Sequence, residues 1–373
     1  MVRPEVRNFE PYLPGKPIEE VQRELGLKKI IKLASNENAL GASKKVQKAL
    51  REAGLEVFRY PEGPGTLLRR AIAKRSKVKE EEVILGAGSD ELIEVLAKAF
   101  FNPGDEVVVS EHAFIRYKMA ADLMGSKSVI VPMKNMAHDL EAMAGKIGNK
   151  TKAVFVANPN NPTGTYVNER QVKAFFAKVA SLKLDPAPFI VFDEAYYEFA
   201  KGLASDYPES LDYFGKGFNL VVLRTFSKIY GLAGLRVGYG IARKEVVEVL
   251  DRVRPPFNVS NVAQKAALAA MTDDSHLKKS LKSVRMGMSY LSRELKDLKL
   301  DYIPSAGNFI LIDAYPKKGK DLFARLLKKG VIIRAMDEYG FPNCVRVTVG
   351  LEDENKFFID KLKEVLKEND FNA

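Results

Sequence analysis

Short apolar segments, each followed by a loop and a helical pattern, constrain the fold of this chain more than any other feature. From about residue 83 they include VILG, VVV, AVFVA, FIVF and LVVL, without polar alternation along them. Strands of this kind are buried on both faces, as in a parallel sheet covered by helices. The run from about 31 to 265 is therefore predicted to be an α/β domain.

The C-terminal third has a different pattern. A long helical stretch near 262–297 leads into NFILID, a helix at 320–329, the strands VIIRA and VRVTV, and a closing amphipathic helix from 353. Helix and strand segments mixed in this way predict a smaller α+β domain.

The first 30 residues form an arm that contains four prolines and a short polar helix near 18–25. We expect this arm to pack on the small domain. The chain has 373 residues, more than the roughly 250–300 at which one core stops growing, so two domains are expected. The predicted division is 31–265 for the large domain, with 1–30 and 266–373 forming the arm and the small domain.

Composition excludes several classes of protein. Lys and Arg number 59 against 48 Asp and Glu, but the two signs are interleaved along the chain, which favours a solvated surface over a nucleic-acid site. Three histidines and the single cysteine, Cys344, are too few for the usual metal sites or an internal disulfide. No apolar run approaches the roughly 18 residues that span a bilayer, and no signal peptide is recognisable. We expect a soluble cytoplasmic protein without a metal or membrane partner.

The first polar motif, Gly86-Ala87-Gly88-Ser89-Asp90-Glu91, lies between a strand and a helix. Backbone N–H groups and the positive end of a helix can bind phosphate at such a place. A dinucleotide-binding fingerprint would have a third glycine where this chain has Glu91, which disfavours a nicotinamide dehydrogenase. Taken alone, the motif fits a tight turn with a Ser or Asp helix cap equally well.

Two further motifs follow the segments AVFVA and FIVF. Asn158-Pro159-Asn160-Asn161-Pro162-Thr163-Gly164 has the residues that a turn requires, but it also leaves Asn side chains at the sheet edge where ligands of α/β sheets bind. Asp193-Glu194-Ala195-Tyr196 puts a carboxylate at the end of a buried strand, which is costly unless a cation or a hydrogen-bond donor meets it. A helix cap is the plain alternative for this second motif.

The fourth motif, Arg224-Thr225-Phe226-Ser227-Lys228, follows LVVL. A lone lysine is nearly always a solvated surface charge, but this one follows a buried strand, and Arg236 comes eight positions later among glycines. Ser227 and Arg236 could hold a phosphate while the amine of Lys228 attacks a carbonyl carbon. The four strand ends together supply what pyridoxal phosphate (PLP) requires: a lysine, an acid for the pyridine nitrogen and a phosphate cup.

Eight stretches then carry a resemblance to a known family. They are SNENALGAS, RYPEG, GAGSDE, NPNNPTG, DEAY, RTFSKIYGLAGLRVGY, SAGNF and VRVTVG. With these, almost the whole chain resembles the fold-type I PLP-dependent aminotransferases, and specifically the histidinol-phosphate aminotransferase family. The resemblance implies a large domain with a mostly parallel sheet, a smaller α+β domain, and transfer of the amino group of histidinol phosphate to 2-oxoglutarate in histidine biosynthesis. The products would be imidazole-acetol phosphate and glutamate.

The resemblance also implies a role for each matching residue. Lys228 would bind PLP covalently and then move the proton between Cα and C4′, while Asp193 would pair with the ring nitrogen. The remaining cofactor contacts would be Asn161 and Tyr196 at the ring hydroxyl group, Gly88, Ser89, Asp90, Ser227 and Arg236 around the phosphate, and Phe114 stacked on the ring. Tyr60 would reach the phosphate from the neighbouring subunit, so the active unit would be a homodimer.

Four residues match family positions near the substrates, a small-molecule amino donor and a 2-oxo acid. Arg346 in VRVTVG matches the arginine that binds the carboxylate of glutamate or the phosphate of histidinol phosphate, and its planar guanidinium suits either anion. Arg334 in VIIRAMDEYG, Tyr12 in NFEPYLPG and Asn36 in SNEN match the other positions. The chain departs from the family pattern at Ala39, where a proline is usual, and at EHAF, which replaces a Pro-Thr-Tyr type of sequence. These departures bear on substrate shape.

Other functions remain open on the same residues. An aromatic amino-acid aminotransferase or a phosphothreonine-type decarboxylase would keep the cofactor and change the substrate. A regulatory or binding protein with the PLP fold is disfavoured because no DNA-binding module is attached and the residues around Lys228 form a complete set.

Overall fold

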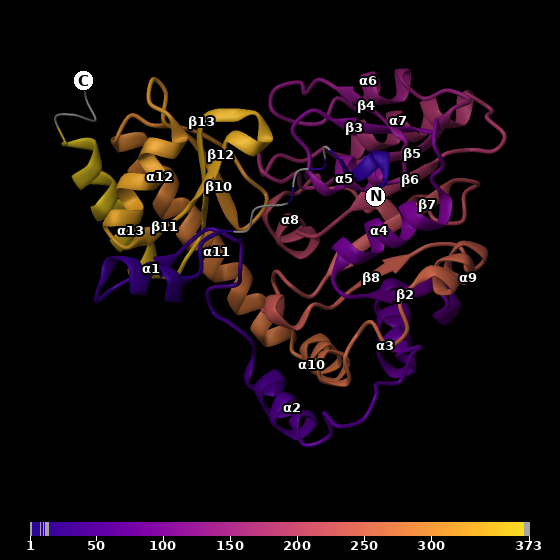
Figure 1. Cartoon of the computed structure of the whole chain (residues 1–373), viewed down its shortest axis with the longest axis horizontal. Helices are drawn as coiled ribbons and strands as arrows, with labels where there is room; N and C mark the ends of the chain where they lie inside the picture. Colours follow the sequence, from indigo (N-terminus) through magenta and orange to yellow (C-terminus); the bar gives the residue numbers. More distant parts are fainter. Residues whose placement is uncertain (1, 8, 10, 12–14, 369–373) are drawn as a thin grey trace.

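A seven-stranded sheet and a four-stranded sheet lie side by side and are joined by the long helix α11 (Asp274–Asp297) (Figure 1). The computed structural model describes residues 2–7, 9, 11 and 15–368. Leu277 and Val284, in the first half of α11, pack in the core of the large sheet, while Leu291 and Leu295 pack in the core of the small one. The helix therefore belongs to both parts.

The large sheet has the strand order β2-β8-β7-β6-β5-β3-β4. Only β8 runs antiparallel to its neighbours, so the other strands all end at one edge of the sheet. The strands are β2 (Val83–Gly86), β3 (Glu106–Ser110), β4 (Lys127–Val131), β5 (Thr151–Ala157), β6 (Phe189–Asp193), β7 (Asn219–Thr225) and β8 (Gly238–Ile241).

Both faces of this sheet are buried, which the absence of polar alternation predicts. Along β5, Val154 and Val156 pack in the core on one face, while Ala153 and Phe155 pack in the core on the other. The first face is covered by α3 (Thr66–Ser76), α6 (Leu140–Gly145), α7 (Glu169–Ser181) and α10 (Asn261–Met271), and the second by α4 (Ser89–Phe100), α5 (Arg116–Leu123) and α9 (Lys244–Val253). Two more helices, α2 (Lys44–Gly54) and α8 (Tyr197–Leu203), complete this part of the chain.

The small sheet is antiparallel with the order β12-β13-β10-β9. Its strands are β9 (Asp301–Ile303), β10 (Phe309–Asp313), β12 (Arg334–Met336) and β13 (Phe341–Thr348). Apolar side chains of α12 (Gly319–Lys328) and α13 (Glu352–Leu366) share a core with it. The predicted α/β and α+β patterns are therefore both present.

Two details of the predicted elements are wrong. The helical stretch expected over 262–297 is two helices, because Asp273 accepts a hydrogen bond from the His276 backbone N–H and so caps a new helix start. The segment VIIRA, expected as one strand, is divided between β11 (Val331–Ile332), which pairs with β1 (Ile31–Lys32), and β12 of the small sheet.

The N-terminal arm contacts both parts of the molecule. Val21 of α1 (Ile18–Leu25) is buried against Ala34 and Ile332, beside the small sheet. Nearer the N-terminus, the Arg3 guanidinium donates a hydrogen bond to the Leu123 carbonyl at the end of α5. Because β1 pairs with β11, residues 31 and 32 lie beside the C-terminal elements. The predicted division into 31–265 and 1–30 with 266–373 stays a prediction.

Candidate active site

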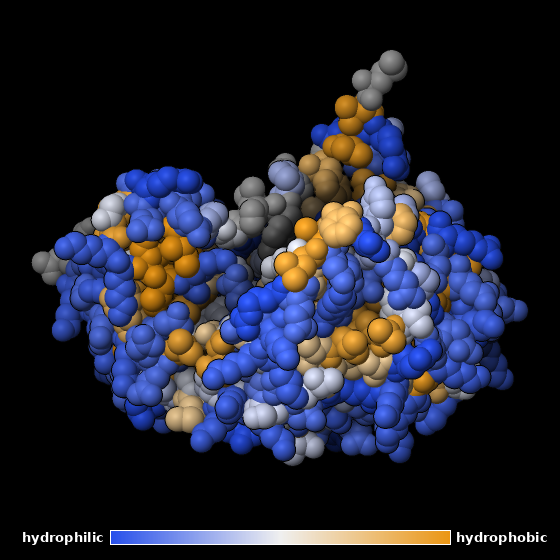
Figure 2. All heavy atoms as spheres, turned by 90° about the horizontal axis from the view of Figure 1, so that it is seen from below, coloured by the Kyte–Doolittle hydropathy of each residue, from blue (hydrophilic) through white to orange (hydrophobic). Residues whose placement is uncertain are grey.

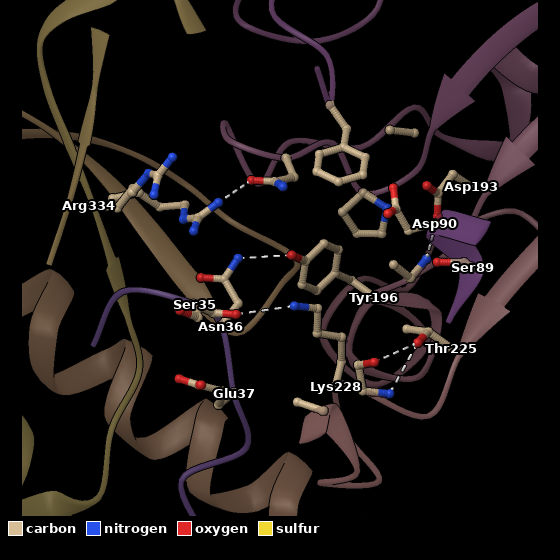
Figure 3. Close-up of a pocket in the computed structure, with 18 of the residues that line it drawn as sticks. Ser35, Asn36, Glu37, Ser89, Asp90, Asp193, Tyr196, Thr225, Lys228 and Arg334 are labelled. Carbon is tan, nitrogen blue, oxygen red and sulfur yellow. Dashed lines mark hydrogen bonds between the residues drawn. The ribbon is translucent and has the colours of Figure 1, made fainter. Parts of the chain in front are cut away.

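A cavity of about 270 Å³ lies between the two sheets, at the edge where the parallel strands of the large sheet end (Figure 3). Asn161 follows β5, Asp193 ends β6, Ser227 and Lys228 follow β7, and Ser89 begins the helix after β2. Parallel strands bring their carboxyl ends to one edge, which is where such sheets bind ligands. The four motifs that are far apart in the sequence therefore meet in this cavity.

The Lys228 side chain points into the cavity from the segment after β7 (Figure 3). Its Nζ donates a hydrogen bond to the Ser35 carbonyl oxygen at 3.2 Å and lies 5.4 Å from the centre of the Tyr196 ring. Among the ion pairs of the described part of the chain, none includes this amine, whose hydrogen bond goes to the Ser35 carbonyl. An amine held by a neutral carbonyl rather than by an ion pair is available for covalent chemistry.

The Asp193 carboxylate is buried, and its two oxygens have different partners. Oδ2 accepts a hydrogen bond from the Tyr117 hydroxyl at 2.7 Å, and Oδ1 accepts one from the Ala195 backbone N–H at 3.2 Å. Burial raises the pKa of Asp193 to about 6, although both hydrogen bonds lower it. A buried carboxylate of this kind gains stability when a cation comes close to it.

Tyr196 and Asn36 are hydrogen-bonded to each other in the wall of the cavity (Figure 3). The Asn36 side-chain amide donates to the Tyr196 hydroxyl at 2.8 Å, and the Asn36 backbone N–H donates to the hydroxyl oxygen of Thr348 at 2.9 Å. Asn36 has a positive φ of 57°, which asparagine tolerates better than most residues. This bond network fixes the N-terminal loop to the end of β13.

The turn between β2 and α4 contacts the side chain of Arg236. Gly88 has φ +82°, where other residues are strained, and a Cβ there would lie 2.5 Å from Nη2 of Arg236 and would displace the guanidinium. The guanidinium donates to the Ser227 hydroxyl oxygen at 3.3 Å and to the Ala87 carbonyl at 3.4 Å. The hydroxyl of Ser227, the guanidinium and the N-terminus of α4 are groups that could together hold a phosphate group.

Asp90 lies in this turn, where its charge would repel a phosphate. Its Oδ1 accepts a hydrogen bond from Nε of Arg116 at 2.7 Å, and the same guanidinium lies 3.4 Å from a carboxylate oxygen of Glu94. The ion pair offsets the negative charge of Asp90, so its presence is compatible with an anion at the helix start.

Two arginines enter the cavity from the small sheet. Arg334 of β12 and Arg346 of β13 are direct cross-strand partners, so both side chains are on the same face. Arg334 forms an ion pair with Glu338 at 2.7 Å. Arg346 donates to the Ala34 carbonyl at 2.7 Å and to the side-chain oxygen of Asn161, while its buried Nε has no partner among the described residues.

The remaining predicted residues have different places. Phe114 lines the cavity, with its ring edge-to-face against Tyr117 at 5.8 Å. Tyr60 lies outside the cavity: its side chain is 83% exposed and stacks on Phe257 at 4.9 Å. Tyr12 is outside the described residues.

Several residues at the site were not predicted. Tyr117 and Arg116 lie in a helix without a motif, and Ser35 contributes only its backbone carbonyl. Arg224 and Glu194 belong to two of the motifs and have no predicted role there, yet they form an almost fully buried ion pair at 2.7 Å between the ends of β7 and β6. The arginine and glutamate at neighbouring strand ends could have suggested this pair, but nothing in the sequence points to Tyr117.

The described residues contain no cluster of His, Cys, Asp and Glu suited to hold a metal ion. Within the same residues, no helix is both long and apolar enough to cross a membrane.

Comparison with known proteins agrees with this geometry. The family model for aminotransferases of class I and II matches residues 28–362. A histidinol-phosphate aminotransferase from Moorella thermoacetica is 47% identical over 98% of this chain and 92% of its own length. Another from Anaeromyxobacter is 48% identical over 98% of this chain and 99% of its own length.

Solved structures give the same result. A histidinol-phosphate aminotransferase from Sinorhizobium meliloti, solved with pyridoxal 5'-phosphate, superimposes with a TM-score of 0.88 at 26% identity and covers 98% of this chain and 97% of its own. An aspartate aminotransferase from Thermus thermophilus, 22% identical with a TM-score of 0.81 over 98% of this chain and 99% of its own, shares the fold. The predicted fold class is thereby confirmed. The chain belongs to the class I and II aminotransferases and, within them, to the histidinol-phosphate aminotransferase family.

Proposed function

We propose that this protein is a PLP-dependent transaminase that moves the amino group of histidinol phosphate to 2-oxoglutarate, a step of histidine biosynthesis. The observation that carries the proposal is the cross-strand pair Arg334 and Arg346, which faces the same cavity as Lys228 and Asp193. The full-length relatives at 47–48% identity have the same activity in their names.

The residues of the cavity fit PLP. The phosphate would be held by Ser227, Arg236 and the N–H groups at the start of α4, where Gly88 leaves room for the guanidinium. A protonated ring nitrogen would meet Asp193, whose buried carboxylate lacks a cationic hydrogen-bond partner among the described residues. Among the described residues, the Lys228 amine donates its hydrogen bond to the Ser35 carbonyl, and it could bond to the aldehyde carbon.

Bound PLP supplies an electron sink that stabilises the negative charge developing at the Cα of the amino donor. Nζ of Lys228 would take the proton from Cα of the amino donor and deliver it at the C4′ position. Asp193 would hold the proton on the ring nitrogen, because an ionised carboxylate stabilises that cation. Tyr196 and Asn161 would orient the ring through its hydroxyl group, and Phe114 would cover its face.

The arginine pair explains how one cavity can accept two donors. Two like charges that face each other across a sheet are unfavourable unless an anion lies near them. Arg346 has no carboxylate within 4.0 Å in the described residues, and its buried Nε has no partner. The phosphate of histidinol phosphate and the carboxylate of glutamate are both anions that a guanidinium fork can bind.

The test is to give the purified protein histidinol phosphate with 2-oxoglutarate and to measure glutamate. Phenylalanine in place of histidinol phosphate serves as the rival donor, and phosphothreonine tests for decarboxylation. The proposal expects glutamate mainly from histidinol phosphate. Faster transamination of phenylalanine would favour an aromatic aminotransferase, and no turnover with any donor would favour a regulatory or binding protein.

We also propose a homodimer in which Tyr60 of each subunit reaches the cofactor phosphate of the other. Support comes from a cluster of exposed apolar side chains between α2 and α3: Leu55, Val57, Phe58 and Tyr60, all at least 68% exposed. Figure 2 views the molecule from the side of α2 and α10 and shows several separate apolar patches on an otherwise mostly hydrophilic face. An exposed patch of this kind is typical of a surface that a partner covers. The cytoplasmic location stays a prediction.

Hybrid dimers test this arrangement. Lys228→Ala and Tyr60→Ala subunits, each defective alone, are mixed so that subunits exchange. A mixed dimer contains one site with both Lys228 and Tyr60 intact, so activity should rise above that of either variant. The absence of any rise, with exchange verified by mass, would mean that Tyr60 does not act across the interface.

A further inference from the structure

The beginning of α5 supports two carboxylates of the active site with adjacent residues. Arg116 forms the ion pair with Asp90, and the next residue, Tyr117, donates its hydroxyl proton to Asp193 at 2.7 Å. Asp193 is the carboxylate expected to meet the cofactor ring, whereas α5 carries no sequence motif and no residue with a predicted role.

The position of the Tyr117 ring is fixed on two sides. It stacks on Phe155 of β5 with the ring centres 4.7 Å apart and the planes at 12°, and it meets Phe114 edge-to-face at 5.8 Å. The side chain is buried, with 1% of its surface exposed. Burial and the neighbouring Asp193 charge raise the pKa of Tyr117 well above its usual value, so the hydroxyl remains protonated and always donates to Asp193.

We propose that Tyr117 is a positioning residue: its hydroxyl keeps the Asp193 carboxylate ionised and correctly oriented, and thereby sets the lower pH limit of cofactor binding. The inference rests on the proposed function, because it takes PLP as the group that meets Asp193. Tyr117 acts on the cofactor through Asp193, which differs from the direct contacts expected of Tyr196 and Phe114.

The groups facing Asp193 give the direction of the effect. Desolvation and the Asp90 charge raise the pKa of Asp193, whereas the Tyr117 hydroxyl, the Ala195 N–H and the Lys228 ammonium lower it. Removing the Tyr117 hydroxyl therefore raises this pKa above about 6. Since a protonated Asp193 cannot pair with a ring cation, PLP affinity should weaken at a higher pH in the variant than in the wild type.

The experiment measures the dissociation constant of PLP from the apoprotein between pH 5 and pH 9, for the wild type and Tyr117→Phe. Phenylalanine keeps the stacking on Phe155 and removes only the hydroxyl. We expect the acid limb of the affinity profile to move up by about one pH unit, which corresponds to about fivefold weaker binding at pH 6 and about tenfold weaker binding at pH 5. Wild-type affinity should return at high pH. Free PLP titrates in the same way in both experiments, so its titration cannot cause a difference between the two affinity profiles.

Two further variants separate this role from a structural one. Tyr166→Phe also removes a tyrosine hydroxyl, one that donates a hydrogen bond to Asp206 at 2.6 Å and does not line the cavity. The pH profile of PLP affinity of this variant should match that of the wild type. In an Asp193→Asn background, Tyr117→Phe should change the dissociation constant less than twofold, because the titrating group is gone.

An unshifted acid limb in Tyr117→Phe would overturn the inference, as would an equal loss of affinity with and without Asp193. Either result would leave the proposed function intact if the wild type binds PLP and transaminates. A wild-type protein that does not bind PLP would instead refute the proposed function.

Discussion

Arg334 and Arg346 face each other across two antiparallel strands of the small sheet, and both line the cavity that contains Lys228. The sequence separates them by twelve residues and gives no sign that they are partners. Only Arg334 has a carboxylate partner, Glu338, within 4.0 Å among the described residues. The pair is therefore asymmetric: Arg346 carries the charge that is not offset by an ion pair.

This asymmetry predicts different effects of the two alanine variants. Arg346→Ala should impair the half-reactions with both glutamate and histidinol phosphate, by roughly tenfold to a hundredfold, because a charge-assisted hydrogen bond is lost from each. Arg334→Ala should affect histidinol phosphate more than glutamate, since a second cation favours the more highly charged anion. Single-turnover rates for each donor measure both effects. An unchanged ratio of the two rates in Arg334→Ala would limit Arg334 to its ion pair with Glu338.

Lys228→Ala should lose turnover, and Lys228 should be the residue that bonds to PLP. In the described part of the chain it is the lysine that lines the cavity, where a carbonyl and not a carboxylate holds its amine. Borohydride reduction of the protein with bound PLP, followed by peptide mapping, locates the label. A label on any other lysine would contradict this assignment.

Asp193→Asn should still bind PLP at saturating concentration, with weaker affinity than the wild type, but lose most of its activity. The neutral amide has nearly the same shape and can still pair with the ring, but it cannot stabilise a positive charge on the ring nitrogen. Loss of such a preorganised electrostatic partner typically costs on the order of 10²-fold in rate. The comparison is of kcat at saturating PLP. A near-wild-type kcat would mean that another residue pairs with the ring nitrogen.

His138 should make the apoprotein sensitive to acid. Its ring is buried, its Nε2 lies 2.9 Å from the Ala157 carbonyl oxygen in the cavity wall, and burial lowers its pKa to about 4. His138 therefore binds a proton near pH 6.5 in the unfolded chain, but only near pH 4 in the folded chain. This contribution to stability is complete above pH 6.5 and is lost as the pH falls towards 4, by about 2 kcal/mol at pH 5.

The measurement is the free energy of unfolding by urea at several pH values, for the wild type and His138→Gln. The variant should be less stable at pH 7.5, because glutamine does not pack as well as the buried ring. Its free energy of unfolding should nevertheless fall less between pH 7.5 and pH 5 than that of the wild type. Equal pH dependence in both proteins would exclude His138 as the source of the acid sensitivity.

Much of the site could be predicted because each motif follows a buried strand. In a parallel sheet the strands end at one edge, so the Gly88 turn, Asn161, Asp193 and Lys228 had to meet there once the strands were recognised. Asn36 and Arg346 came from the family resemblance, since nothing local in their segments shows where they lie.

The contacts that were missed depend on packing that no local pattern encodes. The cross-strand pairing of Arg334 with Arg346 is set by the register of β12 and β13. Tyr117 reaches Asp193 because its ring is held between Phe155 and Phe114. Phe155 is distant in the sequence, and the short spacing between Phe114 and Tyr117 does not by itself indicate that their rings are in contact. The helix start at Asp273 is a single capping contact within a stretch that is otherwise helical throughout.

The central claim is that this cavity transaminates a phosphate ester whose anion meets Arg346 and Arg334. The most direct test compares kcat/KM for histidinol phosphate with that for histidinol, which lacks only the phosphate. Loss of the charge-assisted contacts to two guanidiniums should lower kcat/KM for histidinol by roughly a hundredfold or more. Equal values for the two donors would contradict the claim, because the arginine pair would then make no use of the phosphate.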